Sequence, residues 1–297
     1  MKMPLPMRRW EDSEPSVRKR RMRKGMYLLP SLFTAANIGF GYIAITQTLQ
    51  GTAADSWHFD LAAKAIGAAI VADGLDGRIA RMTGTTSDFG REFDSLADVI
   101  TFGVAPALLA WMWGFLWLQR FDTPNLHERL VQLGVIVTFL FLVAGASRLA
   151  RFNIQANPQP SNPGRPGRKY FVGMPIPAGA AVVAATIHLL EGRPIESWWM
   201  AAAWSAVVAF AAFLMVSTWR FYSFKDLNLR NRHPFQLVIP IGAFLLLLWY
   251  FSGPVLFVLS VTYMLSGVMT RLASLFRRHP PEAKPAAYEE AEAPGPQ

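Results

Sequence analysis

The chain has 297 residues, of which 52% are hydrophobic and 16% are charged, and it carries a formal net charge of +9. A soluble domain usually has about 25% charged residues, so this composition excludes an ordinary soluble protein. The sequence contains no cysteine, which excludes disulfides, thiolate metal sites and a cysteine nucleophile. Because a bilayer also sorts basic residues, the positive charge is tested against membrane topology before nucleic acid is considered.

Apolar stretches long enough to cross a bilayer, about 20 residues each, recur along the whole chain. Backbone amides in lipid need internal partners, so these stretches are predicted to be helices. In chain order the eight predicted spans are 27–48, 59–81, 93–118, 130–150, 171–190, 196–217, 235–251 and 254–272. Ser252, Gly253 and Pro254 are predicted to form a tight hairpin between the last two. The expected fold is an all-α integral membrane protein with a polar active site facing the cytoplasm.

The distribution of lysine and arginine predicts the orientation. Residues 1–26 hold nine of the 29, and most of the others lie in every second connection and near the C-terminus. By the positive-inside rule, both termini are expected on the cytoplasmic side of the inner (cell) membrane, and nucleic acid is not an expected partner.

Three parts of the chain are expected from these patterns. A basic N-terminal segment covers 1–26, a membrane domain covers 27–272, and an acidic tail rich in proline and alanine, expected to be disordered, covers 273–297. The basic segment either lies on anionic lipid headgroups or serves only as a topology signal.

Four aspartates mark the cytoplasmic ends of the second and third predicted spans. Asp73 and Asp76 are three residues apart and Asp94 and Asp98 are four apart, so each pair shares one face of its helix. The polar segment between the pairs contains glycine, reverses the chain and brings the pairs together. Anions crowded in a partly dehydrated site repel one another, and divalent cations remove that repulsion. Oxygen ligands without histidine or cysteine indicate Mg²⁺ or Mn²⁺, with Ca²⁺ as a further possibility.

The residues around these aspartates suit a pyrophosphate substrate. Two metal ions would neutralise a pyrophosphate and stabilise the leaving oxygen. Gly77 and Ala80 leave room for a bulky group beside the helix, and Arg81 offers a fork for phosphate oxygens. The alternative is a set of solvated charges paired with nearby arginines, but four aspartates at these spacings near a membrane indicate function.

The stretch from Asp73 to Asp98 reads D-x2-D-G-x2-A-R-x8-G-x3-D-x3-D, and in this pattern the chain resembles the CDP-alcohol phosphotransferases. Further segments that resemble the phosphatidylserine synthase branch of this family are Leu29–Asn37, Phe102–Pro106, Arg148–Asn153, Phe171–Pro177 and Ser217–Lys225. The resemblance implies metal-dependent transfer of a phosphatidyl group from CDP-diacylglycerol to L-serine, giving phosphatidylserine and CMP. It also implies a homodimer.

The same resemblance implies roles for individual residues. The four aspartates would bind two metal ions, and Asp98 would also take the proton of the acceptor hydroxyl. The residues implied to contact the CDP-lipid are Asn37, Gly77, Ala80, Arg81 and Ser87.

Three basic residues are candidates for binding the acceptor or a lipid phosphate. Arg148 and Arg151 lie three residues apart at the cytoplasmic end of a span and can share one face. They bind the serine carboxylate or a lipid phosphate, or else they extend to the membrane interface. Lys225 is either an anion contact or an ordinary cation of an inner loop. Pro175 and Pro177 are expected to break or kink the fifth span near its start.

Other functions remain open on these patterns alone. The same chemistry would serve glycerol 3-phosphate, inositol phosphate or choline as the acceptor. An intramembrane prenyltransferase also uses aspartate clusters and Mg²⁺, although the glycine, alanine and arginine positions of the pattern speak against it. A transporter would show inverted repeats and charges at the membrane midplane, whereas these carboxylates lie at one boundary.

Overall fold

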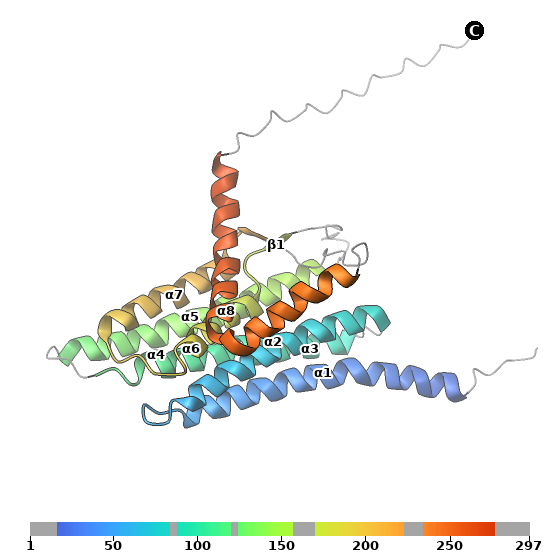
Figure 1. Ribbon diagram of the computed structural model, residues 1–297, viewed down its shortest axis with the longest axis horizontal. Helices are drawn as coiled ribbons and strands as arrows, with labels where there is room; N and C mark the ends of the chain where they lie inside the picture. The colour runs from blue at the N-terminus through green and yellow to red at the C-terminus, as the bar shows by residue number, and fades with distance from the viewer. Residues whose placement is uncertain (1–16, 84–87, 120–123, 157–169, 223–233, 277–297) are drawn as a thin grey trace, which may run out of the picture.

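The computed structural model describes residues 17–83, 88–119, 124–156, 170–222 and 234–276, with side chains for 32–75, 89–119, 125–154, 172–221 and 239–273. The elements in chain order are α1 (Val17–Gln50), α2 (Trp57–Thr83), α3 (Asp88–Asp98), the π-helical turn η1 (Val99–Val104), α4 (Ala105–Phe115), α5 (Pro124–Ala156), β1 (Tyr170–Val172), α6 (Ile176–Leu189), α7 (Trp198–Val216), β2 (Arg220–Tyr222) and α8 (Pro234–Phe276). Most of the long helices lie roughly side by side, and the last part of α8 crosses them (Figure 1). Helix α1 packs along α2, α5 along α7, and α6 against both α2 and α8.

Within the part of the chain that the structure describes, four helical segments are long and apolar enough to cross a membrane. They are Phe89–Phe115, Asn125–Ile154, Trp198–Val216 and Ile239–Ala273, and α6 is a shorter apolar helix. The predicted class, an all-α membrane protein that crosses the bilayer several times, is therefore confirmed. Each of the eight predicted spans overlaps a helix, while the number of crossings stays a prediction.

The fifth predicted span begins later than expected. Residues 170–172 form β1, which pairs antiparallel with β2 so that Phe171 lies opposite Phe221. Gly173 then turns the chain with a φ of 78°, and its N–H donates to the Trp219 carbonyl at 2.9 Å. Pro175 is the N-cap of α6. Because proline disfavours a helical residue before it, a helix start at 171 was wrong, and a small sheet joins the helices.

The third predicted span is interrupted by the π-helical turn η1. This turn begins directly after Asp98, between α3 and α4. Pro106 lies in the first turn of α4. Its nitrogen has no hydrogen to donate to the preceding turn, and its ring crowds the carbonyl one turn earlier. The wider π turn accommodates this crowding, and such turns frequently occur at functional sites.

The break predicted near the end of the chain takes the form of a kink. Phe251 has non-helical angles, φ −133° and ψ 42°, so α8 consists of two helical arms. Figure 1 shows the two arms of α8 pointing in different directions. The location agrees with the predicted hairpin at Ser252–Pro254 to within one residue, but the arms join without a separate loop.

The core is closed by large aromatic side chains between α4 and α7. The rings of Trp113 and Trp204 meet edge to face with centroids 5.1 Å apart. The indole N–H of Trp204 donates to the Ala110 carbonyl at 3.0 Å, so this buried polar group is satisfied. Many alanines along α6 and α7 are buried, and small residues let helices approach closely in a membrane. Of these helices, α6 packs against α2 and α7 against α5, and α2 and α5 carry residues of the predicted site.

Candidate active site

Three of the four predicted aspartates come together, one from α2 and two from α3. Asp73 lies on α2, and Asp94 and Asp98 lie one turn apart on α3. One carboxylate oxygen from each residue lies within 4.8 Å of the other two. Asp76 is one turn further along α2, and its side chain lies outside the described residues. The spacing of the aspartates along each helix is what directs them to one place.

Helix α5 is joined to α3 beside this cluster. The Asn153 side-chain amide donates to the Ser95 hydroxyl at 2.8 Å, and the same hydroxyl donates to the Arg91 carbonyl at 2.9 Å. Ser95 directly follows Asp94 in the chain. The two hydrogen bonds therefore restrain α3 at Ser95, directly beside Asp94.

Helix α1 is joined to the other end of the cluster. The Asn37 side-chain amide donates to an Asp98 carboxylate oxygen at 3.4 Å, a long hydrogen bond. The Thr101 hydroxyl, on η1, donates to the Asn37 main-chain carbonyl at 3.1 Å. A Cβ atom at Gly41 would overlap the Thr101 side chain, so α1 and η1 are in close contact. Asp98 is thus positioned by α1 as well as by its own helix.

The two arginines predicted to share a face have different surroundings. Arg148 is buried at 8% exposure and lies with its guanidinium carbon 5.3 Å from the centroid of the Phe152 ring. Its charge interacts with Asp98 and with Tyr263 of α8. Arg151 instead donates to the Val216 carbonyl at the end of α7, at 3.3 Å. Of this pair, it is Arg148 whose charge is described as interacting with Asp98.

The charge balance of the site favours a bound cation. Three carboxylates this close repel one another when ionised, and the charge of Arg148 offsets only part of that repulsion. A hard divalent ion is suited to carboxylate oxygens without histidine or cysteine. The donor set of the cluster therefore fits the divalent metal that the sequence pattern predicts, without selecting between Mg²⁺ and Mn²⁺.

Several predicted site residues lie outside what the structure describes. For α2, only the backbone is described at Gly77, Ala80 and Arg81. Ser87 and Lys225 lie outside the described residues altogether.

The structure also adds residues that the sequence pattern did not single out. Thr101, Ser95 and Tyr263 approach the site through the contacts given above. Thr101 stands out only as a hydroxyl group within an apolar segment, and Ser95 lies among the charged residues of α3 with no signal of its own. For Tyr263 no sequence signal exists, because α8 is brought to α5 only by the fold.

Known proteins with similar sequences indicate the family of this chain. The sequence profile described as CDP-alcohol phosphatidyltransferase matches residues 27–212. A CDP-diacylglycerol–serine O-phosphatidyltransferase from Helicobacter pylori is 38% identical over 209 residues, which are 68% of this chain and 75% of that protein. Proteins with the same name from Methanocaldococcus jannaschii and Mycobacterium leprae are 39% identical over 128 residues and 37% identical over 177 residues. These matches cover 43% and 59% of this chain, and 51% of each relative.

Proposed function

The chain belongs to the CDP-alcohol phosphatidyltransferase family, and from this premise we propose that it transfers a phosphatidyl group from CDP-diacylglycerol to L-serine, giving phosphatidylserine and CMP. The observation that carries the proposal is the convergence of Asp73, Asp94 and Asp98 within the matched region. The names of the similar proteins support CDP-diacylglycerol and serine as the substrates.

Asp73, Asp76, Asp94 and Asp98 are the residues that would hold the divalent metal ions, Mg²⁺ or Mn²⁺. When bound, such ions neutralise the pyrophosphate of a CDP-lipid and stabilise the charge on its leaving oxygen. The aspartates lie at the proposed membrane boundary. The CDP-lipid would reach them laterally from the inner leaflet. Gly77 and Ala80 leave room for the cytidine, while Arg81 and Ser87 contact the nucleotide or its phosphates.

Asp98 is the proposed base of the reaction. Its carboxylate takes the proton of the serine hydroxyl, and the hydroxyl oxygen attacks the phosphorus on the lipid side of the pyrophosphate. A new P–O bond to serine forms as the P–O bond to CMP breaks, so CMP leaves with the bridging oxygen. The contacts of Asp98 with Asn37 and its proximity to Arg148 support this role, because a base must be held in one orientation.

Arg148 is the proposed partner of the anionic group of the acceptor. It is buried, and its charge interacts with Asp98, so an anion bound to it would lie near the base. A planar guanidinium binds a carboxylate through paired hydrogen bonds. Arg151, whose guanidinium donates to the end of α7, and Lys225 are secondary candidates, for a lipid phosphate.

The proposal extends to the setting of the enzyme. We place both termini in the cytoplasm of a cell with the site at the inner face of its inner membrane, as the lysine and arginine distribution predicts. The membrane domain is proposed over 27–272, between a basic segment and a C-terminal tail. A homodimer is the proposed assembly, and the many exposed apolar side chains of α8 are compatible with contact to a second chain or to lipid.

The purified full-length protein with CDP-diacylglycerol and one acceptor at a time tests the function. CMP release is expected with L-serine. It should be lost when divalent ions are chelated and should return when Mg²⁺ or Mn²⁺ is added. Glycerol 3-phosphate, inositol phosphate and choline are the comparison acceptors. CMP release with one of these and none with serine would reject the proposed acceptor. Turnover of an isoprenyl diphosphate without any CMP from the CDP-lipid would reject the reaction itself.

A further inference from the structure

Asn37 lies in an unusual position for a polar side chain. It is in the middle of α1, 1% exposed, and separated from Asp98 by 61 residues of sequence. Its main-chain carbonyl accepts the Thr101 hydroxyl, so the backbone at this point is held against η1. The side chain is therefore fixed beside the proposed base.

The orientation of the Asn37 amide follows from its neighbour. A carboxylate only accepts hydrogen bonds when ionised, so the NH₂ group of the amide must face the Asp98 oxygen. The opposite orientation would bring two partially negative oxygens together. The amide oxygen Oδ1 consequently points away from that carboxylate oxygen.

This oxygen lacks a hydrogen-bond donor. Among the described residues, Asn37 Oδ1 is buried from solvent and accepts no hydrogen bond. Buried polar atoms are nearly always paired, and an unpaired one in a native structure calls for a specific explanation. A ligand that brings an N–H group beside Asp98 provides the missing partner.

We propose that Asn37 determines acceptor specificity by accepting a hydrogen bond from the ammonium group of an amino-alcohol acceptor. This inference rests on the proposed function. In serine the ammonium group and the reactive hydroxyl are on neighbouring carbons, so a hydroxyl at Asp98 brings the ammonium to the adjacent amide. Asn37 thus contacts the base with its NH₂ group and the acceptor with its oxygen. This role replaces the CDP-lipid contact that the family resemblance implied for Asn37.

The chemistry of the site distinguishes serine from other acceptors. Choline carries a quaternary nitrogen with no N–H to donate. Glycerol 3-phosphate and inositol phosphate offer only neutral hydroxyls, and a hydrogen bond from a charged donor is about twice as strong as a neutral one. With Arg148 assigned to the carboxylate, Asn37 and Arg148 together recognise the two charged groups of an α-amino acid.

The experiment compares L-serine with 3-hydroxypropanoate, which is serine without its ammonium group, using full-length protein and CDP-diacylglycerol. The unmodified protein is expected to favour serine in kcat/KM by on the order of tenfold to hundredfold. The Asn37→Leu variant is expected to bring that ratio close to one. Because both acceptors need Asp98, any loss of base positioning cancels in the ratio.

Two further variants separate this role from a structural one. Thr101→Val removes the neighbouring hydrogen bond to the Asn37 main chain and is expected to leave the serine preference unchanged. Asn37→Asp retains an oxygen acceptor and is expected to keep the preference while lowering kcat for both acceptors. If Asn37→Leu does not fold, the comparison of the two acceptors with the unmodified protein still tests the inference.

Several results would overturn the inference. Equal use of both acceptors by the unmodified protein would show that the ammonium is not recognised, whatever the variants do. An unchanged ratio in Asn37→Leu, with a higher Mn²⁺ concentration for half-maximal activity, would assign the oxygen to a metal. No serine-dependent CMP release from the unmodified protein would reject the proposed function and this inference with it, whereas the first two results reject the inference alone.

Discussion

At the scale of single residues, a substitution of Asp98 tests the proposed reaction most directly. The Asp98→Asn variant keeps the size of the side chain but removes the basic oxygen, and a general base contributes about 10²- to 10⁴-fold to a rate. We expect CMP release with serine to fall by at least that factor. The measurement is the initial rate of CMP release from CDP-diacylglycerol in detergent.

The matched control for this substitution is Asp55→Asn. Asp55 is exposed between α1 and α2, and its backbone N–H donates to the Thr52 hydroxyl. It has no proposed role in the reaction. Activity close to that of the unmodified protein is expected. A folded Asp98→Asn protein as active as the Asp55→Asn control would contradict the assignment of the base.

At the scale of elements, the contact between α1 and η1 is tight. A methyl group at Gly41 would overlap Thr101, whereas one at Gly39 would meet nothing within 4 Å. Overpacking of this kind costs about 1–3 kcal/mol, while alanine in place of an open helical glycine gains about 0.5–1 kcal/mol. We expect Gly41→Ala to lower the free energy of unfolding and Gly39→Ala to leave it unchanged or raise it.

Unfolding of the two glycine variants in mixed micelles, followed by circular dichroism, measures this difference. Because η1 begins directly after Asp98, Gly41→Ala should also reduce CMP release more than Gly39→Ala does. Equal stability of the two variants would show that α1 and η1 are not in the close contact described above.

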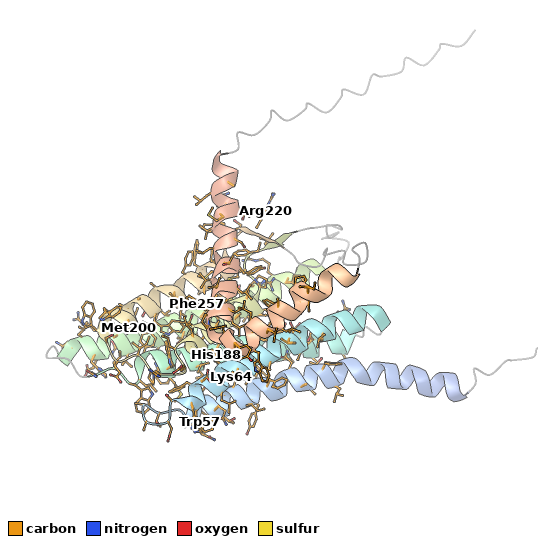
Figure 2. The ribbon with its side chains drawn as sticks, viewed as in Figure 1. Trp57, Lys64, His188, Met200, Arg220 and Phe257 are labelled. Atoms are coloured by element: carbon orange, nitrogen blue, oxygen red, sulfur yellow. The ribbon has the colours of Figure 1, made fainter. Side chains whose placement is uncertain are left out.

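A second contact between elements lies on α2, α6 and the kink of α8. The two ring nitrogens of His188 contact an Asp60 carboxylate oxygen at 2.5 Å and the Ser252 hydroxyl at 2.8 Å. Asp60 also pairs with Lys64 at 2.7 Å, and Figure 2 shows Lys64 and His188 close to each other. This hydrogen-bonded chain holds the start of the second arm of α8 against the bundle.

We expect His188→Ala to destabilise the protein by about 1–3 kcal/mol, because it removes the hydrogen bonds to the part-buried side chains of Asp60 and Ser252. The sequence has no cysteine, so a single Ser260→Cys reporter on α8 should react faster with a maleimide in the His188→Ala background. The control is Glu191→Gln, which breaks the exposed pair with Arg193 and should cost less than about 1 kcal/mol. Equal labelling rates in both backgrounds would contradict an anchoring role.

At the scale of the whole molecule, the testable feature is the orientation in the membrane. Single cysteines at Asp55, between the first two predicted spans, and at Glu196, at the outer end of the sixth, should react with an impermeant maleimide in intact spheroplasts. Cysteines at Ser13 and Ala291, near the two termini, should react only after permeabilisation. Both results follow if lysine and arginine are retained in the cytoplasm.

Labelling of one terminus but not the other in intact spheroplasts would require an odd number of crossings. That result would contradict the predicted eight spans, whereas labelling of neither would support an even number. The site would keep its geometry in either case, because the contacts among α1, α2, α3 and α5 do not depend on the tails.

Features that repeat along the chain were predictable from the sequence by itself. The apolar lengths and the position of the charges predicted helices and membrane crossing, since lipid requires every backbone amide to be paired within its own segment. The intervals within Asp73–Asp76 and Asp94–Asp98 predicted one shared face per helix, because helical periodicity is local. The proline and glycine near residue 252 predicted the break in α8 for the same reason.

Contacts between distant segments were decided only by the tertiary structure. Asn37 meets Asp98 across 61 residues and His188 meets Asp60 across 128, and no local pattern encodes such a pairing. The pairing of β1 with β2 and the π turn after Asp98 likewise depend on what packs beside them. The burial of Arg148, in contrast to Arg151 one turn later, follows from which side of α5 the other helices cover. The sequence thus determined which chemical groups are available at the site, and the packing of α1, α5 and η1 decided how Asp98 is held among them.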